Sequence, residues 1–231
     1  MKPAQIEGMV EAIARVCRHV ARTRAVLAGI SGIDGSGKST IAPRVVEGLR
    51  GRGLRTELIL LDDWHNPKDV RFDPHRPAET FYEKGLRHKE LFQKLVLPLQ
   101  RERRVQLTAT ISRQPDEVPF QHTFRYENVD VVVFEGIFLF KKEFQQHFDF
   151  RCWVECPFEI ALERALRRNQ EGQTREGLIR DYETIYFAAQ RLHFERDQPW
   201  QGVDFLFDNA AEATGGARET RTAKAGSTDE H

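Results

Sequence analysis

The chain has 231 residues, which suits one globular domain or one domain with appendages. Lys plus Arg and Asp plus Glu both number 35, so no net charge favours nucleic acid or a membrane surface as a partner. No apolar stretch approaches the roughly 20 residues of a membrane span, residues 1–9 lack a signal-peptide pattern, and three cysteines argue against a disulfide framework, so we expect a cytoplasmic protein.

The predicted elements alternate between helices and strands along most of the chain. Apolar side chains at helical spacing predict helices, and short apolar runs predict strands. The helices are expected at residues 4–21, 38–51, 79–100, 143–147, 158–170 and 176–195. The strands of the main sheet are expected at residues 25–31, 54–61, 129–135, 150–156 and 203–207.

This order predicts an α/β fold with a mostly parallel five-stranded sheet. Residues 105–111 and 120–126 are expected to form a small inserted hairpin, and the proline-rich stretch 66–77 reads as irregular. We divide the chain into a leading helix at 1–22, a main domain at 23–210, and a tail at 211–231. The tail lacks an apolar face, so we expect it to be disordered.

A glycine-rich loop follows the first strand and precedes a helix. Residues 32–39 read Gly-Ile-Asp-Gly-Ser-Gly-Lys-Ser, which fits the P-loop pattern G-x-x-x-x-G-K-[ST]. Backbone N–H groups of such a loop cradle phosphates, its lysine reaches the terminal phosphates, and its serine hydroxyl can ligate Mg²⁺. The predicted nucleotide-binding residues are Gly32, Asp34, Gly35, Ser36, Gly37, Lys38, Ser39 and Thr40, with Lys38 also catalytic.

Two carboxylates and two rings follow the second strand, in the order Asp62, Asp63, Trp64 and His65. Sites in parallel sheets gather at the carboxyl ends of the strands. Phosphoryl transfer to an alcohol needs a group that accepts the hydroxyl proton, and Asp62 is our candidate for this base. Asp63, Trp64 and His65 are candidate substrate contacts. The alternative for the aspartate pair is ordinary turn chemistry.

Glu135 follows a nearly continuous apolar run, Val-Asp-Val-Val-Val-Phe, at the end of the third strand. A charge placed there is costly unless it has a partner. Mg²⁺ that bridges nucleotide phosphates would be such a partner. We therefore predict a metal site at Ser39, Glu135 and Asp62, with a solvent-exposed carboxylate as the alternative for Glu135.

Arginines cluster on the helix predicted after the fourth strand and in the segment that follows it. Arg164 and Arg168 are four residues apart and share one face, and Arg175 comes after a polar loop. A lid at about 164–180 that carries these arginines could close over the transferring phosphate. Arg168 is the candidate catalytic arginine, and a solvated basic face is the alternative.

These residues together resemble the uridine kinase and phosphoribulokinase family of P-loop kinases. The resemblance rests on residues 29–40, 61–67 and 131–139, and it covers roughly residues 20–209. It implies a three-layer α/β/α fold with sheet order 2-3-1-4-5, and phosphorylation of a small alcohol by ATP or GTP with Mg²⁺. In uridine kinases the aspartate matching Asp62 is the base at the nucleoside 5′-hydroxyl, and arginines matching the region 164–175 lie over the phosphates.

The acceptor end departs from the family pattern. Residues 107–115 lack the Tyr-Asp element and the basic pair of well-studied uridine kinases. A nucleoside is our first candidate acceptor, and pantothenate or a sugar phosphate is the alternative, for which Arg71, His75, Arg76 and Arg87 could serve. An ATPase or nucleotide switch without a small acceptor also stays open, as does assembly into a homo-oligomer.

Overall fold

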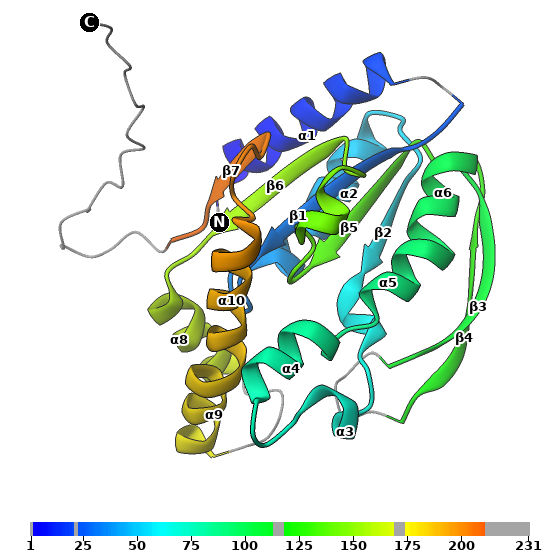
Figure 1. Ribbon diagram of the computed structural model, residues 1–231. Helices are drawn as coiled ribbons and strands as arrows, with labels where there is room; N and C mark the ends of the chain where they lie inside the picture. Colours follow the sequence, from blue (N-terminus) through cyan, green and yellow to red (C-terminus); the bar gives the residue numbers. More distant parts are fainter. Residues whose placement is uncertain (1, 21–22, 113–117, 169–173, 211–231) are drawn as a thin grey trace, which may run out of the picture.

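The computed structural model describes residues 2–20, 23–112, 118–168 and 174–210 (Figure 1). Its centre is a five-stranded sheet in the order β2-β5-β1-β6-β7, in which all the strands run parallel. The strands are β1 (Val26–Gly32), β2 (Thr56–Leu60), β5 (Val131–Gly136), β6 (Phe150–Glu155) and β7 (Phe205–Asp208). The predicted α/β fold and the order 2-3-1-4-5 among the sheet strands are confirmed. The segment 211–231, expected to be disordered, lies outside the described residues.

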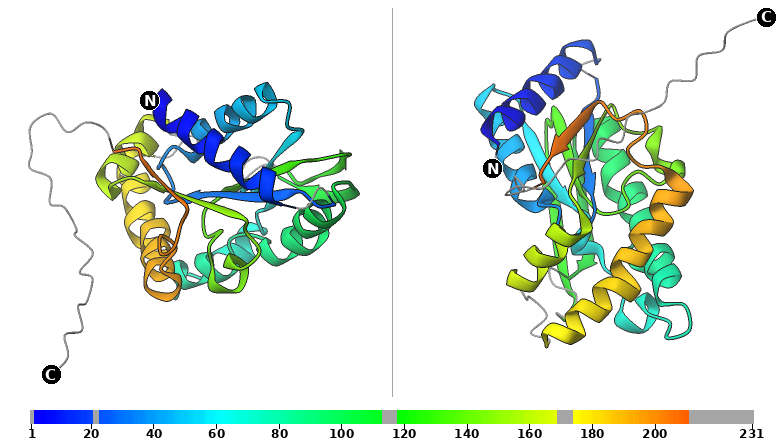
Figure 2. Two further views of the ribbon diagram at one scale, coloured as in Figure 1. Left: turned by 90° about the horizontal axis from the view of Figure 1, so that it is seen from above. Right: turned by 90° about the vertical axis from the view of Figure 1, so that its left-hand side faces the viewer.

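Apolar side chains on the two faces of the sheet form two separate cores. One core lies beneath α1 (Pro3–His19) and α2 (Lys38–Gly51), where Met9 and Ile41 pack with alternate strand residues such as Ala28. The other core contains the remaining strand residues, among them Phe134. Figure 2 shows the resulting three layers, with α1 and α2 on one side of the sheet and the larger helical layer on the other.

The second helical layer consists of short helices from several parts of the chain. They are α3 (Lys68–Arg71), α4 (Pro77–Lys84), α5 (His88–Leu91), the π-helical turn η2 (Phe92–Val96), α6 (Leu97–Glu102), α7 (Lys142–Gln145), α8 (Phe158–Arg168), α9 (Arg175–Asp181), the π-helical turn η3 (Tyr182–Tyr186) and α10 (Phe187–Asp197). No described helix has the length and apolar character that a membrane crossing needs.

Two details differ from the sequence prediction. The helical run expected to close near Pro98 continues to Glu102, with the π-helical turn η2 directly before α6. A π-helical turn interrupts the regular hydrogen-bond ladder, so the missing N–H of Pro98 falls beside an existing irregularity. The stretch 66–77, expected to be irregular, contains the one-turn helix α3, which begins directly after Pro67.

A two-stranded hairpin stands beside the main sheet. Strands β3 (Val105–Ile111) and β4 (Phe120–Tyr126) pair antiparallel, from Val105 opposite Tyr126 to Ile111 opposite Phe120. The apolar face of the hairpin joins the core on the side of α5 and α6 through Ala109, Ile111 and Phe124. The hairpin lies at the end of the sheet near β2, far from α8 and α9 (Figure 1).

Candidate active site

The P-loop joins β1 to α2 and wraps close to the start of α8. Gly35 and Gly37 have φ of +73° and +97°, which only glycine adopts readily. A Cβ on Gly35 would lie 2.6 Å from the carbonyl oxygen of Ala161, so a side chain there would also collide with α8. Lys38 is buried at the first turn of α2, and its Nζ donates to the carbonyl oxygen of Ile33 at 2.9 Å. The lysine is thus held within the loop that it would serve.

Two side chains fix the P-loop from its carbonyl side. Arg164 donates through Nη1 to the carbonyl oxygens of Gly35 at 3.4 Å and Ser36 at 3.2 Å, and through Nη2 to that of Asn209 at 2.8 Å. The Asn209 side-chain amide also donates to the Ser36 carbonyl oxygen, at 2.7 Å. Arg164 Nη1 also lies 3.3 Å from Cys156 Sγ, so its guanidinium braces the P-loop in this structure. Its role as a lid arginine over the phosphates stays a prediction.

Glu135 lies at the centre of the site. The register pairs it with Ile30 on β1 and Leu60 on β2, one or two residues before the P-loop and the turn that carries Asp62. Its side chain is 2% exposed, and its Oε1 has no hydrogen-bond partner in the described part of the chain. Burial raises the pKa of Glu135 to about 8, opposed by Lys38 and reinforced by Asp62 and Asp34. Residues from three strand ends therefore share one electrostatic site.

Asp62 and His65 come from a short 3-10 turn, η1 (Leu61–Trp64), and the residue after it. Asp62 is partly exposed, and its charge acts on both Glu135 and His65. Burial lowers the pKa of His65, although the Asp62 carboxylate opposes this shift, and the charges of Arg71 and Arg87 add to it. His65 is therefore a neutral ring beside Asp62 at neutral pH.

Trp64 does not face a substrate as predicted. Its side chain is 0% exposed and stacks on Phe124 of the hairpin, with ring centroids 5.9 Å apart. The guanidinium of Arg87 also lies over the ring, 4.9 Å from its centroid. The sequence places Trp64 beside the candidate base, but Trp64 is fully buried while Asp62 stays partly exposed, so Trp64 belongs to the core.

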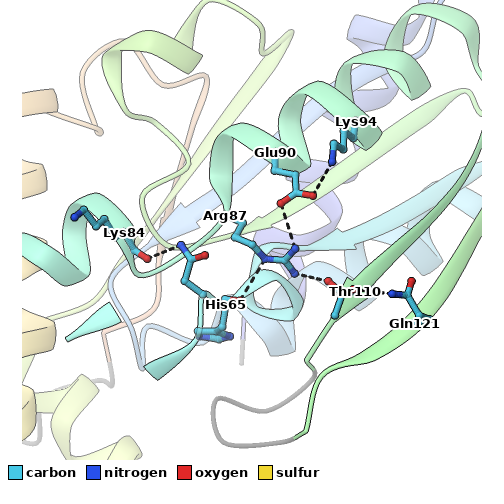
Figure 3. A network of polar contacts seen from close by, with 8 residues as sticks. His65, Lys84, Arg87, Glu90, Lys94, Thr110 and Gln121 are labelled. Carbon is cyan, nitrogen blue, oxygen red and sulfur yellow. Dashed lines mark hydrogen bonds and ion pairs between the residues drawn. The ribbon is translucent and has the colours of Figure 1, made fainter. Parts of the chain in front are cut away.

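Arg87 connects the turn of the candidate base to the hairpin (Figure 3). Its Nε donates to the carbonyl oxygen of His65 at 3.3 Å, its Nη1 pairs with Glu90 at 3.2 Å, and its Nη2 donates to the carbonyl oxygen of Thr110. The backbone adds a second connection, because the N–H of Ser112 donates to the carbonyl oxygen of Asp63 at 3.0 Å. The position of Asp62 is thus tied to β3.

On the opposite side of the site, a carboxylate of the P-loop meets the lid region. Asp34 accepts a hydrogen bond from the hydroxyl of Tyr182 in η3, and its Oδ1 lies 3.8 Å from Nη2 of Arg168. Arg168 is thus brought to the P-loop. Arg175 starts α9 as an exposed residue, and no hydrogen bond or ion pair joins it to the P-loop residues.

The comparisons with known proteins agree with this geometry. The sequence profile of the phosphoribulokinase/uridine kinase family matches residues 27–190, more than half of the 231-residue chain. The chain belongs to this family. The uridine kinase of Saccharomyces cerevisiae is 27% identical over 166 residues, which cover 70% of this chain and only 32% of the yeast protein. The uridine kinase of Salmonella paratyphi B is 26% identical over 164 residues, covering 68% of this chain and 76% of the relative.

Solved structures show that the fold is shared more widely than the sequence. A possible uridine kinase from Bacillus stearothermophilus superposes with a TM-score of 0.67 at 22% identity, covering 87% of this chain and 100% of that one. A D-glycerate 3-kinase from Cryptococcus neoformans superposes with a TM-score of 0.57 at 14% identity, covering 89% and 95%. At these identities the likeness establishes the fold of this family member and leaves its acceptor open.

The residues of this phosphoribulokinase/uridine kinase family member fit a bound Mg²⁺. Mg²⁺ in kinases is held by one or two carboxylates together with substrate phosphates, without a cage made only of protein ligands. In the described ranges, no group of three or more His, Cys, Asp or Glu residues forms such a cage. The buried Glu135 carboxylate lacks a partner at Oε1, Asp62 lies within electrostatic range of it, and Ser39 is exposed on the first turn of α2.

Two residues of the site have no local sequence signal. Tyr182 and Asn209 contact the P-loop from segments more than 140 residues away in the chain. A side chain that reaches a site only through the tertiary fold leaves no motif, so spacing alone could not identify these two residues. Arg71 and Arg87, named from the sequence as candidates for the acceptor end, both act on the pKa of His65.

Proposed function

We propose that this protein is an ATP-dependent kinase that transfers the γ-phosphate to a hydroxyl group of a small molecule, with a nucleoside such as uridine or cytidine as the first candidate. One observation carries the proposal: the parallel register places the buried Glu135 between Ile30 on β1 and Leu60 on β2, directly before the P-loop and the turn that carries Asp62. The phosphate-binding loop, a buried carboxylate and a candidate base therefore lie side by side at one end of the sheet, as transfer from a nucleotide to an alcohol requires.

Each side chain has one role in this proposal. The P-loop amides, with Gly32 to Thr40, hold the phosphates of ATP. Asp62 accepts the proton of the acceptor hydroxyl and aims its oxygen at the γ-phosphorus. Lys38 and Arg168 offset the charge that develops on the transferring group. Arg164 keeps the P-loop in shape, and Arg175 could approach only by a movement of α9.

Ser39, Glu135 and Asp62 are the residues that would hold Mg²⁺. Bound there, Mg²⁺ would neutralise phosphate charge and orient the phosphates. Glu135 must be deprotonated to serve as a ligand. Because its pKa is raised to about 8, most of the ligand-free protein keeps this proton at neutral pH, and a bound cation would favour its release.

His65 serves this reaction as a neutral neighbour of the base. Because burial lowers its pKa, His65 is uncharged at neutral pH and does not form an ion pair with the Asp62 carboxylate. It can donate one hydrogen bond from the wall of the acceptor site. Asp63 lies on the same turn, and its backbone is bound by Ser112 of the hairpin.

A different small alcohol is the second candidate acceptor. Arg71 is 2% exposed, and its positive charge acts on His65 next to the base. A cation in that place would suit an acceptor with a carboxylate or phosphate, such as pantothenate or a sugar phosphate. The structural neighbour that phosphorylates D-glycerate belongs to this chemical class.

An acceptor screen tests the proposal. The purified protein with Mg²⁺ and ATP is mixed in turn with nucleosides, pantothenate and sugar phosphates, and ADP release and phosphorylated product are both measured. We expect slow ADP release without an acceptor and a large increase with one class, matched mole for mole by product. ADP release at one rate whatever is added, without phosphorylated product, would instead identify an ATPase.

A further inference from the structure

The P-loop contains a negative charge, although it is built to bind an anion. Asp34 lies between Ile33 and Gly35, its side chain is about 30% exposed, and its charge acts on the buried Glu135. Two like charges a few ångströms apart repel each other. A carboxylate that rotated freely over the loop would therefore weaken phosphate binding, so its direction matters.

The hydroxyl of Tyr182 fixes that direction. Tyr182 donates to Oδ2 of Asp34 from 148 residues further along the chain. Its own side chain is 1% exposed, and its ring lies 5.1 Å from the ring of Tyr186 and 5.1 Å from that of Phe187. A packed ring holds its hydroxyl in one place. Tyr182 is also the first residue of the π-helical turn η3, and such turns often lie at functional sites.

We propose that Tyr182 is a positioning residue of the nucleotide site, which holds the Asp34 carboxylate against η3 and out of the space that the phosphates of ATP occupy. The inference rests on the proposed function, since it assumes that the P-loop binds a polyphosphate. Tyr182 itself touches no phosphate in this account. It acts only through Asp34, to which it gives a hydrogen bond of the stronger, charge-assisted kind.

The same bond determines where Arg168 rests. Tyr182 occupies Oδ2 of Asp34, and Arg168 approaches the other oxygen, Oδ1, at 3.8 Å. This ion pair is long, and the Arg168 side chain is 43% exposed, so the pair is weak and can give way to a phosphate. Tyr182 thereby helps to hold Arg168 beside the P-loop.

A double-mutant cycle on ATP binding tests the proposal. Mg·ATP affinity is measured by titration calorimetry, without an acceptor, for the wild type, Tyr182→Phe, Asp34→Asn and the double variant. A hydrogen bond to a charged group contributes about 1.5–3 kcal/mol, so we expect Tyr182→Phe to raise the Kd for ATP about tenfold or more. Asp34→Asn alone should bind ATP at least as tightly as the wild type. The double variant should match Asp34→Asn within about twofold, because the charge that Tyr182 restrains is gone.

Tyr82→Phe is the matched control. Tyr82 is also a buried phenol that donates to a carboxylate, Oδ2 of Asp197 at 2.5 Å, at the C-terminal end of α10. The variant Tyr82→Phe should have a lower melting temperature than the wild type and an unchanged affinity for ATP. An unchanged Kd in Tyr182→Phe, or a loss of affinity that Asp34→Asn does not restore, would overturn the inference. The binding measurements contain no acceptor. A protein that binds ATP but phosphorylates nothing would therefore contradict the proposed function and leave the result of this binding test unaffected.

Discussion

The two ends of the site are built in different ways. The donor end is mainly backbone: a glycine loop, the first turn of α2, and a buried lysine that bonds to a carbonyl five residues away. The acceptor end is mainly long side chains: Arg87 joins the turn after Asp62 to Thr110, 23 residues away along the chain. The comparison teaches that the P-loop itself is specified by local sequence. The turn after Asp62, like the braces that Arg164 and Asn209 provide to the P-loop, depends on contacts between distant segments.

The largest expected effect concerns the core of the acceptor end. Trp64→Ala should lower the free energy of unfolding by about 3–5 kcal/mol, because it removes a fully buried ring that packs against Phe124 and Arg87. Urea denaturation measures this loss. If Trp64 lined the acceptor site instead, stability would change little and the KM for the acceptor would rise, which would contradict the buried position.

At the donor end, Lys38→Met should reduce kcat by about 10²–10³-fold, because it removes a preorganised cation from the transferring phosphate. Steady-state kinetics with the acceptor found in the screen measure this effect. The variant also loses the bond to Ile33, so its melting temperature is measured in parallel. A kcat within twofold of the wild type in a folded variant would remove Lys38 from the proposed role.

Glu135 lies between the donor end and the acceptor end, and its raised pKa makes the free energy of unfolding depend on pH. Its pKa of about 8 in the folded protein lies above the value of about 4.3 expected in the unfolded chain. The folded state therefore binds this proton more tightly than the unfolded chain does. The contribution of this proton to the free energy of unfolding is fully present below about pH 4 and is lost as the pH rises toward 8. The slope can reach about 1.4 kcal/mol per pH unit.

Urea denaturation of the ligand-free protein between pH 5 and 9 should show this decline, and Glu135→Gln should flatten it. Equal slopes in the two proteins would contradict a buried, protonated Glu135.

The smallest of these effects concerns the connection between the hairpin and the base. Arg87→Gln should reduce kcat/KM for the acceptor about tenfold, since the bonds to Thr110 and His65 that hold the turn of Asp62 are lost. The KM for ATP should stay the same. Lys94→Gln is the control, because Lys94 joins only the exposed end of this network, through Glu90 at 2.9 Å. An equal loss in both variants, or a rise in the KM for ATP, would argue against the connection.

The comparison also explains what the sequence predicts and what it does not. The P-loop and the strand-end positions of Asp62 and Glu135 are predictable, because each depends on a local pattern of glycines or apolar residues. The sheet order follows from the family resemblance. The prediction that Trp64 contacts a substrate is wrong, because its side chain is fully buried against Phe124. The spacing of Arg164 could not reveal its hydrogen bonds to the P-loop carbonyl oxygens, which depend on the tertiary fold.

The most direct test of the account compares ATP binding with turnover in Asp62→Asn, beside the matched change Asp63→Asn on the same turn. Calorimetry gives the Kd for Mg·ATP, and product formation gives kcat. The account predicts that Asp62→Asn lowers kcat by about 10²–10⁴-fold while the Kd changes little, and that Asp63→Asn has a much smaller effect on kcat. Full turnover in Asp62→Asn, or an equal loss in Asp63→Asn, would contradict the claim that Asp62 faces the γ-phosphate of a bound nucleotide as the base.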